Sequence, residues 1–131
     1  MKSDYYELSN GKQAIYYIYT YKLGFSYGNA FKYLVRASRK PGNSAESDLN
    51  KALTYITSSK EEYSCFYRAV VKLTNMLKFK HKDKLQNNDI HRILMSIISF
   101  NSYKEIAEMI VAYMNKRGIP VKDEFKQYEK S

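Results

Sequence analysis

One segment of the chain combines, at helical spacing, residue types that bind phosphate. Asn29, Lys32 and Arg36 recur at intervals of three or four residues, and Lys40 continues the series. Residues at this spacing lie on one face of a helix. Arginine offers a planar pair of donors, lysine offers a mobile charge, and a helix start led by glycine offers free N–H groups. The segment therefore predicts a helix whose polar face binds phosphate.

The following predicted helix adds a cation and an aromatic ring. Lys51 and Tyr55 are spaced i, i+4, so that they share one side of that helix, and a tyrosine ring can stack on a base. We expect phosphate or nucleotide binding by Asn29, Lys32, Arg36, Arg39, Lys40 and Lys51, and stacking by Tyr33 and Tyr55. The alternative interpretation is an amphipathic helix whose basic face is only solvated.

Other catalytic patterns are missing from the sequence. Gly24 and Gly28 are too close for a phosphate loop, and no lysine follows them at the required spacing. His81, His91 and Cys65 lack the spacing of zinc ligands. We expect Cys65 to be a small buried residue and His91 to be an ordinary surface or hydrogen-bonded histidine. The sequence therefore assigns no catalytic residue and no metal site.

Composition and charge limit the classes of protein and partner. The 131 residues are 44% hydrophobic and 27% charged, which suits one domain with its own core. The 22 Lys and Arg against 13 Asp and Glu give a net charge of +9, which favours anionic partners. No apolar run approaches the roughly 20 residues that span a bilayer, so no membrane is expected. We see no signal peptide, and a single cysteine predicts a cytoplasmic protein.

The hydrophobic period is helical along most of the chain. Helices are expected over 12–23, 29–40, 44 to about 58, about 60–79, 88–98 and 102–117. These segments predict an all-α protein, a compact bundle of five to six helices. Residues 15–21 are β-branched and aromatic, so a local strand is the alternative there. Gly24 is expected to end the first helix, and the charged last ten residues are expected to fray.

Two further expectations concern the second half of the chain. The residues predicted to face the core from the fourth helix are Tyr63, Phe66, Ala69, Val70, Leu73, Met76 and Leu77. Residues 78–84 form a basic connection, interpreted as a solubilising loop rather than a second anion-binding patch. Asn88 is expected to cap the fifth helix, and Ser102 with Glu105 has the spacing of a capping box.

The phosphate-binding segment also resembles a known family. Gly28-Asn29-Ala30-x-Lys32-Tyr33-Leu34-x-Arg36-Ala37-x-x-Lys40, followed by Asp48-Leu49-x-Lys51-Ala52-x-x-Tyr55, resembles a small phage-encoded domain family. That family is typified by a nucleotide kinase of coliphages that lacks a phosphate loop, and the resemblance covers about residues 5–57. It implies a kinase-like helical domain over 1–58, with 59–131 as a helical bundle extension packed on it.

The resemblance also implies a function. It points to a phage or prophage protein in the cytoplasm of a bacterial host that binds nucleotides as a homo-oligomer. If the chain is a nucleoside monophosphate kinase, ATP and magnesium would be its cofactors. Tyr16 stands where the family usually has an acidic residue, and Ser38 where it often has glycine. The missing carboxylate would remove a general base or a magnesium contact.

Three classes of function follow from these observations. The first is a nucleotide-binding protein, kinase-like if it is an enzyme. The second is a non-enzymatic phage effector that binds nucleic acid or a host nucleoprotein and inhibits a bacterial defence system, as anti-CRISPR proteins do. The third is an oligomeric interaction protein whose partner-binding part spans 63–114. Salt dependence separates the first two, because binding to a long nucleic acid weakens steeply with salt.

Overall fold

The protein is an all-α bundle, as the helical period predicts. The computed structural model describes residues 6–8, 10–39 and 44–130. Its α-helices are α1 (Ala14–Thr20), α2 (Gly24–Arg39), α3 (Ser44–Ser58), α4 (Cys65–Lys78), α5 (Asp89–Ile98) and α6 (Tyr103–Lys116). Short 3₁₀ helices are η2 (Ser59–Glu61), η3 (His81–Asp83) and η4 (Asp123–Tyr128).

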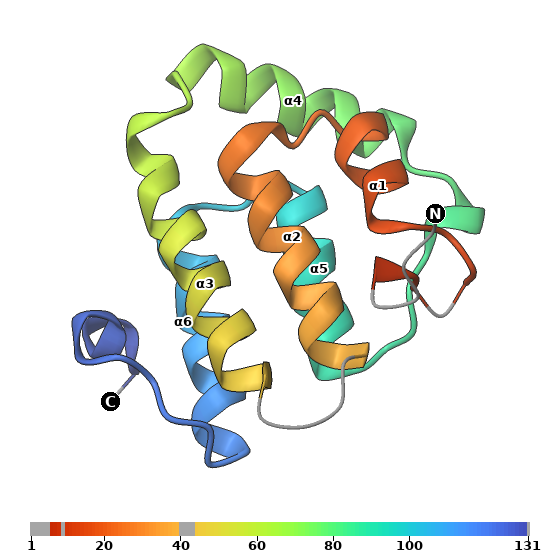
Figure 1. Ribbon diagram of the computed structural model, residues 1–131. Coiled ribbons are helices and arrows are strands. Elements are labelled where there is room, and N and C mark those ends of the chain that lie inside the picture. Colours follow the sequence, from red (N-terminus) through yellow and green to blue (C-terminus); the bar gives the residue numbers. More distant parts are fainter. Residues whose placement is uncertain (1–5, 9, 40–43, 131) are drawn as a thin grey trace.

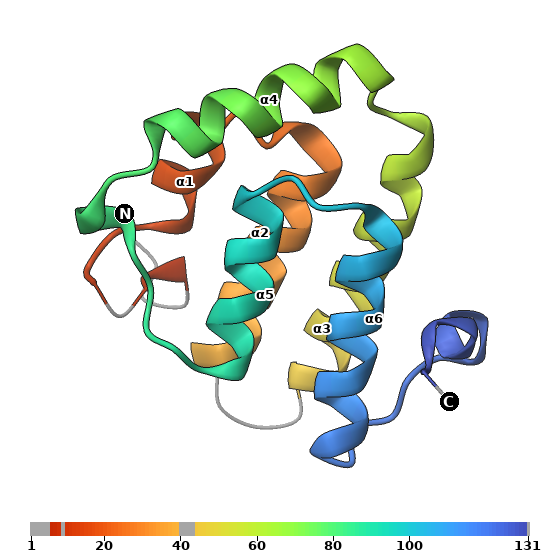
Figure 2. The ribbon, with the colours of Figure 1, turned by 180° about the vertical axis from the view of Figure 1, so that it is seen from behind.

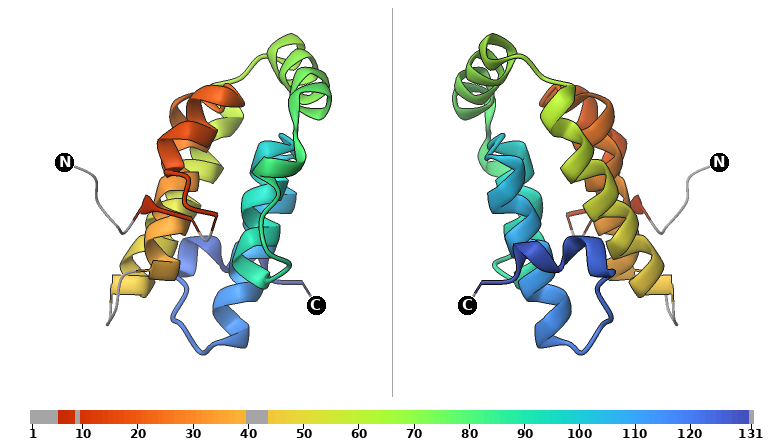
Figure 3. Two further views of the ribbon diagram at one scale, coloured as in Figure 1. Left: turned by 90° about the vertical axis from the view of Figure 1, so that its right-hand side faces the viewer. Right: turned by 90° about the vertical axis from the view of Figure 1, so that its left-hand side faces the viewer.

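The helices form two layers with a crosspiece at one end. α1, α2 and α3 make one layer, α5 and α6 make the other, and α4 crosses the end of both (Figures 1 and 3). α2 packs against α3 along its length, and α6 packs against α3 across the layers. The core between the layers includes Phe31, Leu53, Ile97 and Ile110, all fully buried. The second half of the chain thus lies directly on the first, and the proposed division between residues 58 and 59 stays a prediction.

The strand alternative for residues 15–21 is wrong, because this segment carries helix α1. Tyr17 and Tyr21, four residues apart, are both fully buried, whereas Ile15 and Tyr19 are exposed. A strand would place all four of these odd-numbered residues on one face. A helix instead places Tyr17 and Tyr21 on one side and Ile15 and Tyr19 on the other. Packing of the two buried rings against the bundle therefore overrides the local preference for a strand.

Gly24 begins α2 rather than ending the helix before it. Its φ of +77° suits glycine, and a Cβ there would lie 2.9 Å from Cε1 of Tyr63. The carboxylate of Glu62 accepts hydrogen bonds from the backbone N–H groups of Phe25 and Ser26, each at 3.0 Å. Glu62, which is 37 and 36 positions away from these two donors, thus caps α2. This distant cap explains why α2 begins five residues before its expected start.

The orientation predicted for α4 is wrong. Phe66 and Leu77 are 79% and 78% exposed, and Val70, Leu73 and Met76 are exposed as well. The opposite face packs on the bundle, where the Asn75 Nδ2 donates to the carbonyl oxygens of Tyr21 at 2.9 Å and Ile98 at 2.8 Å. The polar groups on that face find partners in the bundle, so α4, which lies across the end of the bundle (Figure 2), turns its apolar face outward.

The same reversal of α4 places Cys65 at the surface, where the sequence predicts burial.

The last ten residues do not fray as expected, because the 3₁₀ helix η4 holds residues 123–128 on the bundle with Phe125 buried. Asn50 holds the approach to η4: its Nδ2 donates to the Pro120 carbonyl at 3.2 Å, and its Oδ1 accepts from the Lys122 N–H at 3.1 Å. The tail is therefore part of the bundle.

The expected helix caps of the second half are confirmed. Asn88 Oδ1 accepts from the His91 N–H at 3.0 Å, and Ser102 Oγ accepts from the Glu105 N–H at 3.3 Å.

None of the helices in the described ranges has the length and apolar character that crossing a bilayer would require.

Candidate phosphate-binding surface

The polar sides of α2 and α3 meet on one outer surface of the bundle. α2 buries Ala30, Phe31, Leu34 and Val35, which leaves the residues three or four positions apart on its other side facing outward. We call the surface formed by Asn29, Lys32, Tyr33, Arg36, Lys51 and Tyr55 the α2–α3 face. All six were expected to bind or stack, and the pairing of α2 with α3 brings them to one side.

Tyr33 lies at the centre of this face. Its ring stacks with that of Tyr55, with centroids 5.9 Å apart and an interplanar angle of 11°. The Nζ atoms of Lys32 and Lys51 lie 5.2 and 5.4 Å from the centroid of the Tyr33 ring. Two cations from different helices therefore lie close to one pair of parallel rings, an arrangement that favours a ligand with both phosphate groups and bases.

Lys32 and Lys51 form no ion pair with any residue that the structure describes. Lys51 is exposed, and Lys32 is half-buried. Lys51 also borders an open polar hollow of about 420 Å³, whose other lining residues include Glu46, Asn50 and Lys122. The two ammonium groups are therefore available for an anion in solution.

Arg36 is held within the fold. Its Nε lies 3.5 Å from Oδ2 of Asp48, and its Nη1 donates to the hydroxyl of Tyr6 at 3.1 Å. The hydrogen bond to Tyr6 is the main cause that raises the pKa of Arg36, so the residue keeps its charge. Because one side of the guanidinium faces a buried carboxylate, Arg36 contributes to packing between α2 and α3, and only its outer part faces the solvent.

The structure does not bring the other predicted phosphate ligands together with Lys32 and Lys51. Asn29 Nδ2 donates to the carbonyl oxygen of Phe25 at 2.8 Å, which leaves its Oδ1 for another partner. Arg39 lines a cavity of about 190 Å³ together with Ser38 and His91, so it belongs to the contact between α2 and α5. Lys40 lies outside the described residues. The predicted row of cations thus reduces to two free lysines beside a tyrosine pair.

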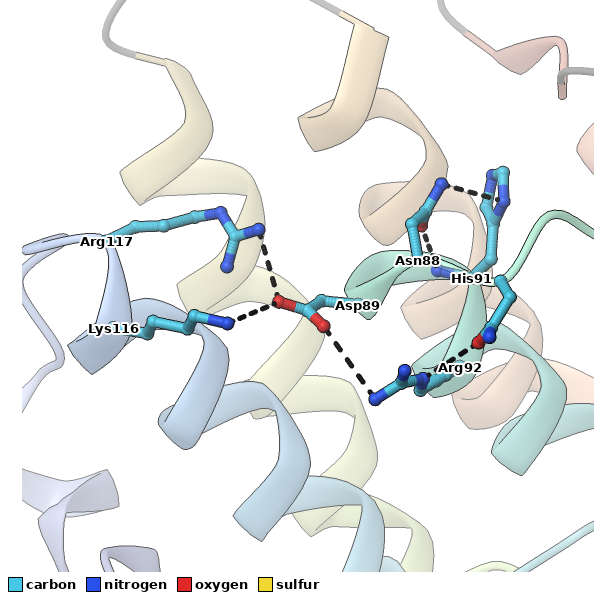
Figure 4. A network of polar contacts seen from close by, with 7 residues as sticks. Asn88, Asp89, His91, Arg92, Lys116 and Arg117 are labelled. Atoms are coloured by element: carbon cyan, nitrogen blue, oxygen red, sulfur yellow. Dashed lines mark hydrogen bonds and ion pairs between the residues drawn. The ribbon is translucent and has the colours of Figure 1, made fainter.

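Sequence reasoning missed a second basic cluster, on α5 and α6 (Figure 4). Oδ2 of Asp89 lies 3.3 Å from Lys116 Nζ and 3.3 Å from Arg117 Nη2, and its Oδ1 lies 4.0 Å from Arg92 Nη1. The hydrogen bond from Lys116 is the main cause that lowers the pKa of Asp89. The three cations are already paired with one carboxylate, so this cluster stabilises the packing of α5 on α6. Only the tertiary contact reveals it, because Asp89 pairs with residues 27 and 28 positions away in the chain.

His91 is a buried, hydrogen-bonded histidine, which is one of the two alternatives expected from the sequence. Its Nδ1 lies 3.2 Å from Asn88 Nδ2 and 3.2 Å from the Gln86 carbonyl oxygen. Burial lowers the pKa of its imidazole, and the Gln86 carbonyl opposes that shift. The side chain is thus part of the start of α5.

The face does not fit the magnesium that a kinase would need. None of the six residues of the face is a carboxylate: Asp48 beneath it is buried and held by Arg36, and Glu46 borders only the hollow beside Lys51. Magnesium binds through carboxylate oxygens and water, and no group of three or more His, Cys, Asp or Glu side chains in the described ranges is arranged to hold a metal ion. The two lysines fit phosphate groups, of ATP or of another nucleotide, without a metal.

One family model matches part of the chain. It is described as a protein of unknown function, DUF3310, and the match covers residues 2–57. The matched segment ends one residue before α3 does, so it contains the whole α2–α3 face. No curated protein and no solved structure matches the chain. The segment that carries the face is therefore similar to a family with no stated activity.

Proposed function

We propose that the protein binds single-stranded nucleic acid through the α2–α3 face. Lys32 and Lys51 would contact backbone phosphates, and Tyr33 and Tyr55 would stack on bases. The observation that carries the proposal is the position of two free ammonium groups within 5.4 Å of one tyrosine ring that stacks on a second. Single-strand binding surfaces combine these two elements, cations for the backbone and aromatic rings for the bases.

The shape and charge of the face favour a strand over a single nucleotide. The four side chains lie on the outer surface of two neighbouring helices, and the hollow beside Lys51 is open and polar. The net charge of +9 would attract a polyanion from a distance. A single nucleotide is the second candidate ligand, because the same lysines could hold one phosphate group and the resemblance to a nucleotide kinase points to it.

The test compares two double variants of equal charge. Lys32→Ala/Lys51→Ala removes the cations of the face, and Lys84→Ala/Lys104→Ala removes two exposed lysines elsewhere. Fluorescence anisotropy with a labelled oligothymidylate, measured over a range of salt concentrations, gives both affinity and salt slope. For single strands each lost phosphate contact lowers the slope by about 0.7, so the face variant should lose about 1.4 and the control little.

Two results would contradict the proposal. Equal losses in both variants would show that only the overall charge attracts the strand. Saturable binding of dTMP or ATP at one site per chain, without binding of the oligonucleotide, would favour the single nucleotide. Transfer of labelled phosphate from ATP to dTMP would then establish a kinase. An effector role against a host defence system would require a nucleoprotein target, and the same oligonucleotide assay with that target as competitor would detect it.

A further inference from the structure

α4 carries an apolar face that nothing in the described bundle covers. Its outward residues recur at intervals of three or four, and each is exposed: Phe66, Val70, Leu73, Met76 and Leu77. We call these five side chains the α4 stripe. No charged residue lies within it, because Arg68 and Lys78 are on other sides of the helix and Lys72 borders it beside Met76. Monomeric proteins rarely expose a contiguous apolar surface of this extent.

We infer that the α4 stripe is the contact between two copies of this chain, which pack α4 against α4 in antiparallel orientation. The stripe runs the length of a 14-residue helix, about 21 Å at 1.5 Å per residue. α4 crosses the end of the bundle, outside both layers (Figures 1 and 2). The stripe residues are exposed, so a second helix can reach them.

The exposed area fits a dimer. The five side chains are between 41% and 79% exposed. At roughly 200 Å² for a large side chain, they present about 650 Å² of apolar surface. A stable interface buries roughly 800 Å² on each partner, and the edge of the stripe, where Tyr67 is partly exposed, supplies part of the remainder. The stripe alone is thus close to the size that a two-helix contact requires.

The stripe is self-complementary about a two-fold axis near the middle of α4. With the axis between Val71 and Lys72, Phe66 of one copy lies opposite Leu77 of the other, and Val70 lies opposite Leu73. Four of the five stripe residues then meet an apolar residue, as a two-fold contact between identical surfaces demands, and Met76 lies at the edge of the contact. The row joins one aromatic residue, Phe66, to aliphatic residues and a methionine of different size, which suits interdigitation.

Charge selects the antiparallel orientation. The segment that leads into α4 carries Glu61 and Glu62 with one cation, Lys60. The segment that leaves it carries Lys78, Lys80, Lys82 and Lys84, with Asp83 buried. An antiparallel pair places each acidic end beside the other copy's basic end and opposes the helix dipoles. A parallel pair would place the two basic ends together.

A cleft receives one end of the stripe. It has a volume of about 240 Å³ and is lined mainly by apolar side chains, among them Met76, Phe79, Met95 and Ile98. In the antiparallel arrangement Phe66 of the second copy approaches the Leu77 end of α4, where this cleft opens. An aromatic ring that enters an apolar cleft is a common anchor of an interface.

The first test measures the mass of the protein in solution. Light scattering after size exclusion, over a wide range of protein concentration, should give twice the mass of the chain. Leu73→Glu places a charge in the middle of the stripe and should raise the dissociation constant of the dimer by about a hundredfold or more. The matched control is Ala112→Glu, which adds the same charge to an exposed position of α6 and should leave the dimer intact.

The mass of the wild type and the behaviour of Leu73→Glu together decide the proposal. Leu73 is already 56% exposed, so the variant should keep its circular dichroism spectrum. A wild-type protein that stays monomeric at every concentration, or a Leu73→Glu protein that dimerises as the wild type does, would overturn the proposal. A monomeric wild type would assign the stripe to a different protein.

The second test determines the orientation. Two Cys65 residues in the antiparallel pair are 13 residues apart along the axis, about 20 Å, which is too far for a disulfide. Phe66 of one copy lies opposite Leu77 of the other in that pair, whereas a parallel pair places each stripe residue opposite its own copy. Mild oxidation of an equimolar mixture of Cys65→Ser/Phe66→Cys and Cys65→Ser/Leu77→Cys, one of them carrying a size tag, should therefore link unlike chains. Links between like chains alone would overturn the antiparallel arrangement.

Discussion

The Nε atom of Arg36 lies 3.5 Å from Oδ2 of Asp48, across the contact between α2 and α3. The Asp48 side chain is 3% exposed, and that of Arg36 is 28% exposed. Neither of these two atoms has a hydrogen-bond partner, so they depend on each other for charge compensation. The residue that looked like the centre of a phosphate-binding row is therefore the cation that allows a carboxylate to be buried between two helices.

Loss of this pair should destabilise the fold. Asp48→Ala leaves the inner side of the Arg36 guanidinium without a counter-charge and should lower the free energy of unfolding by about 1–3 kcal/mol; a fully buried pair would lose more. Urea denaturation followed by circular dichroism measures the change. Glu46→Ala, which removes an exposed carboxylate from the same helix, should cost less than about 1 kcal/mol. Equal losses in the two variants would contradict a structural role for Asp48.

The tyrosine pair should contribute to nucleic-acid binding without contributing to its salt dependence. Tyr55→Leu keeps an apolar side chain in place but removes the ring that stacks on Tyr33, and should weaken oligothymidylate binding by about 1–3 kcal/mol. The salt slope should stay at the wild-type value, because no phosphate contact is lost. Tyr19→Leu removes an exposed tyrosine from α1 and serves as the control. Unchanged affinity in Tyr55→Leu would exclude stacking.

Asn75 should be essential for the attachment of α4. Its Nδ2 donates to two carbonyl oxygens, one at the end of α1 and one at the end of α5, and its side chain is almost fully buried. Asn75→Ala leaves both acceptors without this donor and should cost about 2–3 kcal/mol in thermal or urea unfolding. Hydrogen exchange should also show faster opening of α4. Thr74→Ala, one position away on the exposed side, should have little effect on either measurement.

The stability of the fold should decrease in mild acid because of His91. Burial holds the pKa of its imidazole below the ordinary value near 6.5, so the unfolded chain binds the proton first as the pH falls. Stability is therefore complete above pH 6.5 or so and declines below it until the folded protein also binds the proton. Denaturation midpoints between about pH 7 and pH 5 measure this. His91→Gln should flatten the curve; an equally steep curve would contradict the assignment.

Local rules in the sequence account for where most helices lie. Apolar residues repeat every three to four positions, and Asn88 and Ser102 supply side-chain oxygens where α5 and α6 begin. Both the helical period and the side-chain caps involve residues only a few positions apart, so the sequence alone reveals them. The pairing of Lys51 with Tyr55 on one side of α3 follows from the same helical spacing.

The sequence by itself thus determined the all-α class, the main helices and the basic, aromatic character of α2 and α3. Only the tertiary structure decided that α2 starts at Gly24, because its cap is the distant Glu62. It also decided that Arg36 pairs with Asp48 and that α4 turns its apolar side outward. Helical periodicity fixes which residues share a face, whereas the partner of that face depends on contacts between segments far apart in the chain.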